Sequence, residues 1–497
     1  MTVSSAEQLH SDHTLAYHLS LLSLDSSSSQ NEESSLGPVF TASALNQSRA
    51  GPLQYSLLGG VKKVTTTSPY PEEAFLEQDP RLFFNVAAPS STFICGSQGS
   101  GKSHTLSCIL EGCLIPSIAG ELHRPMTGVV FHYDTFISDS GGSPCEAAFL
   151  ASHSSVNVRV LCAPTNLATI KKTYARFNIP VKPLLIDQAN LNTKRMFDLM
   201  AVGQGHGPAP LYVHTVQRIL REMRISQQRT GSQFDYGEFK RRVLNADLLP
   251  GQLEPLKQRL DTLESFMPPQ QAVLPKSQKK KMAVSNSTGS SWTPKPSQLT
   301  IVDLSCPCIS PDTACSLFNV CFGIFMEQDT EIGRVVALDE AHKYMKDSVE
   351  ARTFTDTLLS TVRLQRHLGA RILISTQEPT ISSDLLGLCT VTIVHRFTSP
   401  AWLRALKRHV AAAGVEVKSR EGLQANNEDE AEYLGASRNS SLFRQIVHLR
   451  VGEALLFSPS AIVGAASEQV HTLGDGYMVI KVRNRLTEDG GRSVISS

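Results

Sequence analysis

The stretch that most constrains this chain is FICGSQGSGKSHTL, at residues 93–106. A short apolar run leads into three glycines, a lysine and a serine, and residues 96–103 match the pattern G-x-x-x-x-G-K-[ST] completely. Glycines in such a loop let backbone N–H groups converge on phosphate oxygens, which a Cβ atom would obstruct. The segment therefore predicts a strand, a phosphate-binding loop and a helix, in that order.

The residues of this loop have predictable contacts. Lys102 would place a point charge at the β- and γ-phosphates of a nucleotide, and the Ser103 hydroxyl suits Mg²⁺. The following helix would present its positive N-terminal end to the phosphates. A glycine-rich turn without a ligand is the alternative interpretation. The predicted nucleotide-binding residues are Gly96, Ser97, Gln98, Gly99, Ser100, Gly101, Lys102, Ser103 and His104.

After the loop, apolar runs alternate with helical stretches. The runs are apolar at nearly every position, which is typical of parallel strands covered on both faces. One helical stretch, residues 353–369, ends at Gly369, a plausible residue for closing a helix. Repeated strand–helix units predict a three-layer α/β domain. Strands are expected within residues 59–70, 128–134, 158–164, 183–188, 298–305, 333–340, 370–376, 391–397, 452–462 and 476–491.

Composition divides the chain into unequal parts. Residues 1–55 are rich in serine and are expected to be disordered. A single domain is expected over residues 56–490, interrupted by a helical insertion at about 195–266. Residues 268–297 are rich in Pro, Ser and Lys and predict a disordered loop, and residues 491–497 a loose tail.

A second motif, RVVALDEAH at residues 334–342, supplies the carboxylates that a phosphate-binding loop needs on a strand beside it. Asp339 would hold Mg²⁺ through water. Glu340 would polarise an attacking water molecule, which points to hydrolysis and away from a passive switch. The alternative is that both residues simply begin the next helix.

Three further side chains complete the predicted catalytic set. Gln377 follows the next apolar run, at the strand edge where ligands bind in open α/β sheets, and could contact γ-phosphate and water. Arg363 and Arg366 lie three residues apart, on one face of the predicted helix, and arginine grips phosphate with several donors. In a ring of subunits, one of them could reach a neighbour's nucleotide. A structural glutamine and a solvated helix face are the alternatives, and Arg396 is a further candidate.

Charge and cysteine content exclude several classes. The net charge of +1 excludes a whole-surface polyanion binder, so any nucleic-acid contact must be local. The short basic runs RALKRH (404–409) and KRR (240–242) are more often solvated faces. Ten cysteines in 497 residues do not indicate a disulfide scaffold. The Cys306-Pro-Cys308 pair could bind zinc, but small buried thiols are the simpler interpretation.

Targeting signals are sparse in the sequence. No run of 18 apolar residues predicts a membrane span, and the N-terminus lacks the pattern of a secretory signal. An intracellular protein is expected. The run KSQKKK at residues 276–281 could be a nuclear signal or a solvated charge run, which leaves cytoplasm and nucleus both open.

Taken in order, these motifs resemble the HerA–FtsK branch of P-loop ATPases, and its HerA-like members most closely. GSQGSGKS matches the Walker A loop, and VVALDEAHKYM is similar to the Walker B strand. QLTIVDLS resembles the strand ahead of Walker B, and TVTIVHRFTSP resembles the strand after the sensor. RLQRHLGARILISTQEPTISSDLL is like the family's R-x-x-R-x-x-G, strand and sensor glutamine, and GEALLFSP with VIKVRNRLTEDGG its closing segment. The resemblance covers residues 90–490, patchily between 190 and 297.

The resemblance implies a RecA/ASCE-type P-loop NTPase that binds ATP and Mg²⁺ and moves or remodels DNA as a hexamer. It implies that Lys102 and Ser103 bind phosphate and Mg²⁺ and that Asp339 completes the metal site. Glu340 would be the catalytic base and Gln377 the sensor. Arg366, and less directly Arg363, would act on the neighbouring subunit's ATP.

Two departures from the family pattern leave other functions open. HerA-type proteins carry a small β-barrel ahead of the loop, whereas only 95 residues precede it here and no complete barrel is expected. The helical insertion is also unusual. An ATP-binding regulatory or scaffold protein without motor activity is therefore the main alternative. The letters DEAH also suggest an RNA helicase, but the chain has ISTQEP where a Ser-Ala-Thr element is expected.

Overall fold

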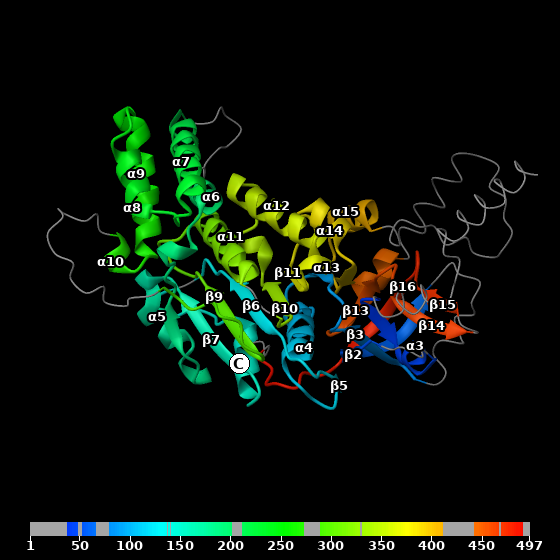
Figure 1. Cartoon of the computed structure of the whole chain (residues 1–497). Coiled ribbons are helices and arrows are strands. Elements are labelled where there is room, and N and C mark those ends of the chain that lie inside the picture. The colour runs from blue at the N-terminus through cyan, green and yellow to red at the C-terminus, as the bar shows by residue number, and fades with distance from the viewer. Residues whose placement is uncertain are drawn as a thin grey trace, which may run out of the picture.

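In the computed structural model of this chain, the described strands join into one sixteen-stranded sheet (Figure 1). The described residues are 37–47, 52–65, 79–136, 138–139, 141–200, 211–272, 289–328, 331–410, 442–466 and 469–490. Most of the Ser-rich N-terminus, the KSQKKK run and the tail after Gly490 lie outside these residues. None of the helices within them is both long and apolar enough to cross a membrane.

Eight neighbouring strands of this sheet run parallel. Seven of them coincide with apolar runs that predicted strands, whereas the eighth is Val181–Pro183 and not the run predicted at 183–188. In spatial order they are β12 (Val391–Val394), β4 (Ser91–Cys95), β11 (Ala370–Thr376), β10 (Arg334–Leu338), β6 (Thr127–His132), β9 (Gln298–Asp303), β7 (Asn157–Cys162) and β8 (Val181–Pro183).

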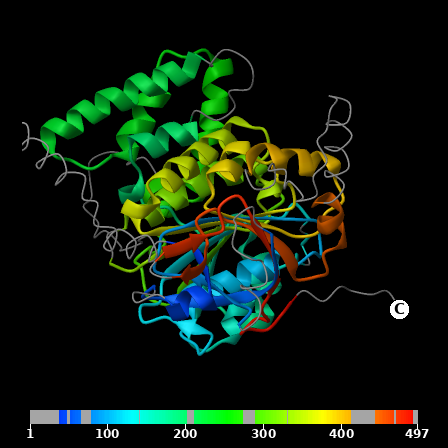
Figure 2. The same ribbon diagram turned by 90° about the vertical axis from the view of Figure 1, so that its right-hand side faces the viewer.

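Helices cover both faces of the parallel strands (Figures 1 and 2). Successive side chains of a strand point to opposite faces, so Phe93 and Ile94 belong to two different cores. The Ile94 side is covered by α4 (Lys102–Leu114), η2 (Glu146–Ser152) and α5 (Leu167–Thr173). The Phe93 side is covered by α11 (Pro311–Glu327), α12 (Val349–Arg363), α14 (Ser383–Leu388) and α15 (Pro400–His409). The predicted three-layer α/β fold is confirmed.

The strand order corrects one expectation from the sequence. The loop strand β4 and the carboxylate strand β10 are not neighbours, because β11 lies between them and pairs with both. Cys95 is level with Thr376, and Leu338 is level with Ile374. All three strands are parallel, so their carboxyl ends still meet at one edge. The residues that follow β4, β10 and β11 therefore meet at this edge, although β4 and β10 are not adjacent in the sheet.

Antiparallel strands extend the sheet beyond β12. They are β13 (Glu453–Phe457), β16 (Tyr477–Val482), β2 (Tyr55–Thr65), β3 (Arg81–Asn85) and β1 (Val39–Thr41), followed by β14 (Ile462–Ala466) and β15 (Gln469–Thr472). The short β5 (Gly120–Glu121) pairs with β2. The three strands that precede β4 thus belong to the main sheet, together with strands from the C-terminal part of the chain.

Two segments expected to be disordered are partly ordered. Residues 37–47 form β1 and α3 (Ala42–Gln47), and the ring of Phe40 stacks on Phe83 with centroids 5.6 Å apart. The local Ser-rich composition suggested disorder because it does not reveal this apolar contact with a distant strand. Residues 289–297 contain the buried Trp292, and the Gly289 N–H donates to Asp187 at 3.0 Å.

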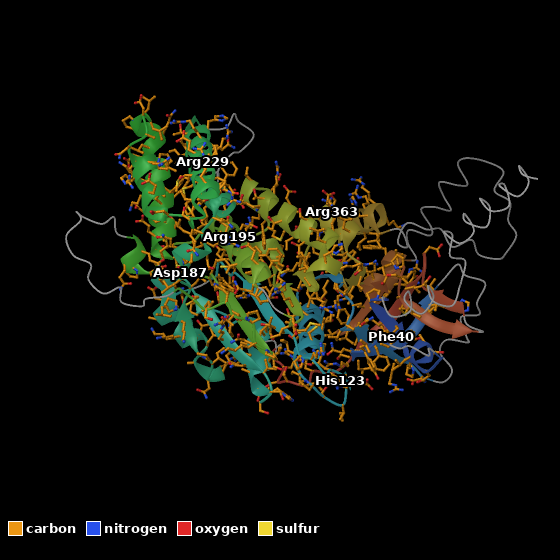
Figure 3. The ribbon with its side chains drawn as sticks, viewed as in Figure 1. Phe40, His123, Asp187, Arg195, Arg229 and Arg363 are labelled. Carbon is orange, nitrogen blue, oxygen red and sulfur yellow. The ribbon has the colours of Figure 1, made fainter. Side chains whose placement is uncertain are left out.

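The helical insertion stands beside the parallel end of the sheet (Figure 1). It consists of α6 (Thr193–Met200), α7 (Leu211–Thr230), α8 (Tyr236–Leu244), α9 (Pro250–Ser265) and α10 (Pro269–Ala272). Its inner faces join the same core as α11. Arg195 of α6 forms an ion pair with Glu327 at the end of α11, with N and O atoms 2.7 Å apart (Figure 3). The insertion is therefore packed onto the sheet domain.

Candidate nucleotide site

The loop between β4 and α4 adopts backbone angles that suit glycine. Gly96, Gly99 and Gly101 have φ angles of 150°, 71° and 112°, which side chains other than glycine rarely adopt. A Cβ atom on Gly96 would also lie 2.7 Å from the Cβ of His395. The glycine pattern that predicted this loop therefore follows from steric limits at its backbone.

Lys102 folds back over the loop. Its Nζ donates to the Ser97 carbonyl at 3.2 Å, and the Ser100 hydroxyl donates to the same carbonyl at 2.7 Å. The side chain is buried, and burial lowers the pKa of Lys102, while the charges of Glu340 and Asp339 oppose that shift. An ammonium group kept from water beside the loop is well placed to bind a polyanion.

The first turn of α4 adds backbone donors. The first backbone hydrogen bond here runs from the Thr105 N–H to the Gly101 carbonyl, 3.0 Å away. The preceding amides of Lys102, Ser103 and His104 therefore lack an intrahelical acceptor, as at every helix start. The His104 ring itself lies against the end of the chain, with Nε2 2.7 Å from the Arg483 carbonyl oxygen. Only the backbone of His104 can contribute to a phosphate site.

Asp339, directly after β10, is held by two buried partners. His132 Nδ1 lies 3.1 Å from its Oδ2 and Cys145 Sγ lies 3.5 Å from the same oxygen. Burial alone would raise the pKa of Asp339, but the hydrogen bond and charge of His132 hold it below its ordinary value. The carboxylate is therefore ionised at neutral pH.

The second oxygen of Asp339 provides a test of whether Mg²⁺ fits. Among the described residues, the buried Oδ1 has no hydrogen-bond partner. A buried anionic oxygen without a partner is costly, and a cation or its bound water would satisfy it. Mg²⁺ typically takes one or two protein oxygens and keeps several waters. The unpartnered Oδ1 fits such an ion, with Ser103 at the start of α4 as the other predicted oxygen ligand.

Glu340 occupies a strained backbone position. Its φ of 49° and ψ of 45° lie in the left-handed region, which costs a residue with a side chain about 1 kcal/mol or more. Gln377 Nε2, after β11, donates to Glu340 Oε2 at 3.4 Å. Burial, followed by the charge of Asp339, raises the pKa of Glu340 above its ordinary value. A carboxylate with a raised pKa is a better proton acceptor at neutral pH.

His342 contacts both of these residues in its neutral form. The Gln377 N–H donates to His342 Nδ1 at 3.3 Å, which requires that nitrogen to carry a lone pair. Burial, followed by the charge of Lys343, lowers the pKa of His342 to about 4. The 3.3 Å approach of the same nitrogen to Glu340 is therefore not an ion pair at neutral pH.

The two arginines lie away from this group. Arg363 ends α12, while Arg366 belongs to the short α13 (Gln365–Leu368), so the expectation that they share one helix face is wrong. Both side chains are exposed, and Leu364 between them breaks the helix because its ψ of 7° departs from helical geometry. Both precede β11, whereas Gln377 follows it, and seven strand residues span about 20 Å. They therefore do not reach the nucleotide site of their own chain (Figure 3 labels Arg363).

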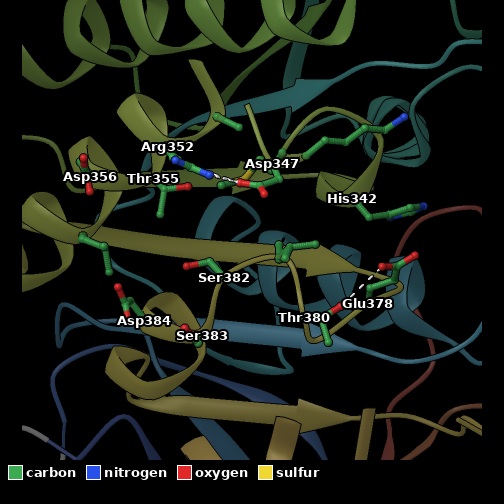
Figure 4. A pocket seen from close by; sticks show the side chains of 15 residues that line it. His342, Asp347, Arg352, Thr355, Asp356, Glu378, Thr380, Ser382, Ser383 and Asp384 are labelled. Atoms are coloured by element: carbon green, nitrogen blue, oxygen red, sulfur yellow. Dashed lines mark hydrogen bonds and ion pairs between the residues drawn. The ribbon is translucent and has the colours of Figure 1, made fainter. Parts of the chain in front are cut away.

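A polar pocket adjoins Glu340 and Gln377. It has a volume of about 530 Å³, and its lining runs from His342 to the start of α14 (Figure 4). One basic residue of the lining, Arg352, is paired with Asp347, with N and O atoms 2.5 Å apart. The acidic residues of the lining are Asp347, Asp356, Glu378 and Asp384. The lining therefore carries four carboxylates against two basic side chains, Lys346 and Arg352, and does not resemble a second phosphate site.

Two other candidate features, the Cys306–Cys308 pair and the basic run at 240–242, do not form sites within the described residues. Cys306 is buried with its Sγ 3.5 Å from the Thr165 hydroxyl, while Cys308 is exposed, and within the described residues no metal-type cluster includes either of them. The basic run at 240–242 is matched by acidic neighbours, for example Lys240 with Glu264 at 2.5 Å. It is a paired surface and not a free basic patch.

His132 and Cys145 are the residues that sequence reasoning missed. They lie 207 and 194 positions from Asp339 in the chain. The one available signal was that His132 ends an apolar run predicted to be a parallel strand, at the same sheet edge as Asp339. Nothing in the sequence pointed to Cys145.

Scans of protein-family models and of curated proteins find no match to this chain. Among solved structures, VirB4 of Thermoanaerobacter pseudethanolicus is similar over 86% of this chain and 96% of its own, with 10% identity and a TM-score of 0.42. The plasmid coupling protein TrwB, in complex with a GTP analogue, matches over 89% and 98%, with 11% identity and the same TM-score. The genome packaging NTPase B204 of Sulfolobus turreted icosahedral virus 2 matches over 36% and 68%, with 12% identity and a TM-score of 0.22. Likeness at this level assigns no activity.

Proposed function

We propose that this chain is an Mg²⁺-dependent ATPase of the translocase type, which acts on DNA as an oligomer. The observation that carries this proposal is the meeting of Lys102, Glu340 and Gln377 at the carboxyl edge of parallel strands β4, β10 and β11. In open α/β sheets this edge binds ligands. A phosphate-binding loop alone is compatible with a nucleotide-dependent switch. A phosphate-binding loop that faces a carboxylate and an amide is suited to nucleotide hydrolysis.

The phosphates would be bound by the loop. The free amides at the start of α4 and the ammonium of Lys102 would take the β- and γ-phosphate oxygens. Asp339 and Ser103 would hold Mg²⁺, which neutralises charge that develops on the phosphates. The glycines permit the close approach of backbone to phosphate that this requires.

Glu340 and Gln377 would act on the attacking water. Their hydrogen bond orients the carboxylate, whose raised pKa suits it to accept a proton as water attacks the γ-phosphorus. ADP would leave with its new charge beside Lys102. The strained backbone of Glu340 is consistent with a residue positioned for chemistry at the expense of stability.

Oligomeric action is supported by the exposed arginines. The side chains of Arg363 and Arg366 make no ion pair or hydrogen bond within the described residues and lie far from the proposed nucleotide site of their own chain. They are therefore available to a neighbouring subunit, where arginine can stabilise charge on a transferring phosphate. The near-neutral charge and the paired basic run at 240–242 favour the alternative, an ATP-binding scaffold that does not move DNA.

The test is a steady-state ATPase assay of the assembled protein with Mg²⁺, with and without double-stranded DNA. Wild type should turn over ATP and be stimulated by DNA. Lys102→Ala should lose ATP binding, whereas Glu340→Gln should keep binding and lose turnover by at least about 100-fold. Glu254→Gln, on the exposed surface of α9, is the matched control and should behave as wild type. An assembled wild-type protein that binds ATP without turnover would favour the scaffold, and one that binds no nucleotide would overturn both.

A further inference from the structure

Three side chains with metal-binding atoms meet beside the proposed catalytic group. His132, Cys145 and Asp339 each offer one ligand atom, and these atoms lie within 4.8 Å of one another. His132 Nδ1 and Cys145 Sγ approach the same carboxylate oxygen, at 3.1 and 3.5 Å. The three residues are 4%, 0% and 3% exposed. Nitrogen, sulfur and oxygen ligands are thus concentrated in one buried place.

The fold fixes each of these side chains. Strands β6 and β10 pair with Phe131 level with Leu338, which brings His132 beside Asp339. The Asp339 N–H donates to the Phe131 carbonyl at 3.0 Å and secures this arrangement. The Cys145 N–H donates to the hydroxyl of buried Tyr174, also at 3.0 Å. Backbone pairing therefore positions His132 and Asp339, and the Tyr174 hydroxyl holds the backbone of Cys145.

The distances match those of a coordinated metal. Zinc binds nitrogen and oxygen at about 2.0–2.2 Å and sulfur at about 2.3 Å, so neighbouring ligand atoms in a tetrahedral site lie about 3.3–3.7 Å apart. The observed separations of 3.1 and 3.5 Å lie at or near that range. A cysteine ligand disfavours Mg²⁺ and Ca²⁺ and favours zinc. Asp339 Oδ1, buried and unpartnered among the described residues, is a second oxygen available at the same place.

We propose that His132, Cys145 and Asp339 form a binding site for a thiophilic divalent cation, represented by Zn²⁺, whose occupation inhibits ATP hydrolysis. Binding through Sγ would displace the Cys145 thiol proton to solvent, and His132 would bind through a deprotonated Nδ1 with its ring proton on Nε2. A water molecule would fill the fourth position, as in zinc sites with three protein ligands.

Inhibition follows because Asp339 would serve two cations. A bound Zn²⁺ would neutralise this carboxylate and repel a second divalent cation a few ångströms away. The chain would then bind Mg²⁺–nucleotide weakly and hydrolyse it slowly. This part of the proposal rests on the proposed ATPase function, whereas metal binding itself does not.

Binding is tested with Co²⁺, whose thiolate complexes absorb in the near ultraviolet, added to the reduced full-length protein. Wild type should show a thiolate–metal band that saturates at one equivalent and is displaced by Zn²⁺. Cys145→Ala should lose the band, and His132→Asn should weaken Co²⁺ binding at least about tenfold. Cys308→Ala, which removes the exposed cysteine, is the control and should keep the band.

The outcomes separate this proposal from the proposed function. A wild-type protein without a thiolate band, or a band lost in Cys308→Ala and kept in Cys145→Ala, would overturn the site. If Cys145→Ala does not fold, two other measurements decide whether the site exists. One is the Co²⁺ binding of His132→Asn. The other is whether zinc protects the Cys145 thiol from alkylation, mapped by mass spectrometry. In the ATPase assay, micromolar Zn²⁺ should slow wild type at least about tenfold and Cys145→Ala less than twofold. Equal inhibition of both would refute the inhibitory role, and a protein without turnover would still show the band.

Discussion

Four residues of the proposed site have positive φ angles, and three of them, Gly96, Gly99 and Gly101, are glycines. At Gly96 the conformation and the nearby His395 exclude any side chain, so the sequence reveals the constraint. At Glu340 a carboxylate is kept at φ 49° despite the strain. A residue that is costly for stability and lies within reach of Gln377 is better explained by function than by folding.

This contrast predicts a trade between stability and activity at position 340. Glu340→Gly should be more stable than Glu340→Ala by about 1 kcal/mol, because glycine adopts the left-handed conformation without the strain of a Cβ atom. Both variants lack the carboxylate and should be equally inactive. Urea unfolding without nucleotide measures the difference. Equal stabilities would show that the backbone at this position relaxes without cost.

At the scale of elements, the segment after β16 secures α4, which begins at the proposed phosphate-binding loop. The segment after β16 lies along α4, where Arg483 donates to Glu111 at 2.7 Å and to the Cys108 carbonyl at 3.0 Å. The Thr487 hydroxyl donates to the same carboxylate at 2.6 Å. Glu111 is fully buried and belongs to the helix that begins with Lys102. The closing segment therefore helps to hold the helix that begins at the proposed nucleotide site.

Removing the Glu111 charge should loosen this attachment. Glu111→Gln leaves the guanidinium of Arg483 without its buried counter-charge, and breaking such a pair typically costs about 3–5 kcal/mol. The free energy of unfolding, from urea titration, should fall by that amount. Glu254→Gln removes an exposed partner of Lys257 and should change stability by less than about 0.5 kcal/mol. Similar small effects for both variants would contradict the proposed role of this segment.

At the scale of the whole molecule, the sheet separates the two groups of residues proposed to act in hydrolysis. Lys102, Glu340 and Gln377 lie at the carboxyl edge of the parallel strands, while Arg363 and Arg366 come before the opposite end of β11. Neither of these two arginines therefore lies at the proposed nucleotide site of its own chain. A head-to-tail ring would bring the arginine of one subunit to the nucleotide of the next.

Mixing experiments test this arrangement. Glu340→Gln and Arg366→Ala should each be inactive as pure assemblies, but a mixed assembly contains interfaces that combine an intact glutamate with an intact arginine. With random mixing, about a quarter of head-to-tail interfaces are complete, so turnover should recover toward that fraction of wild type. Mixing Glu340→Gln with the double variant gives no complete interface and should recover nothing. Mixed assemblies that form and stay inactive would exclude Arg366 as the shared residue, and Arg363→Ala would then be tested in the same way.

The features that could be predicted from sequence are local ones. The glycines of residues 96–101 encode their own backbone angles, and the apolar runs before Asp339 and Gln377 encode buried strands. Gly369 ends its helix with a φ of 57°, as a closing glycine should. In contrast, β1 and α3 were missed because their stability comes from Phe83, a contact distant in sequence.

By itself, the sequence determined which chemical groups follow which strands, because each motif is contained in a few consecutive residues. The tertiary structure alone decided that β11 separates β4 from β10, and that His132 and Cys145 lie against Asp339. The physical reason is that strand order and side-chain contacts depend on pairing between segments some 200 residues apart, as the His132–Asp339 separation of 207 shows. Such pairing leaves no periodic pattern in either segment, so the partners of the proposed metal ligand became visible only in the folded chain.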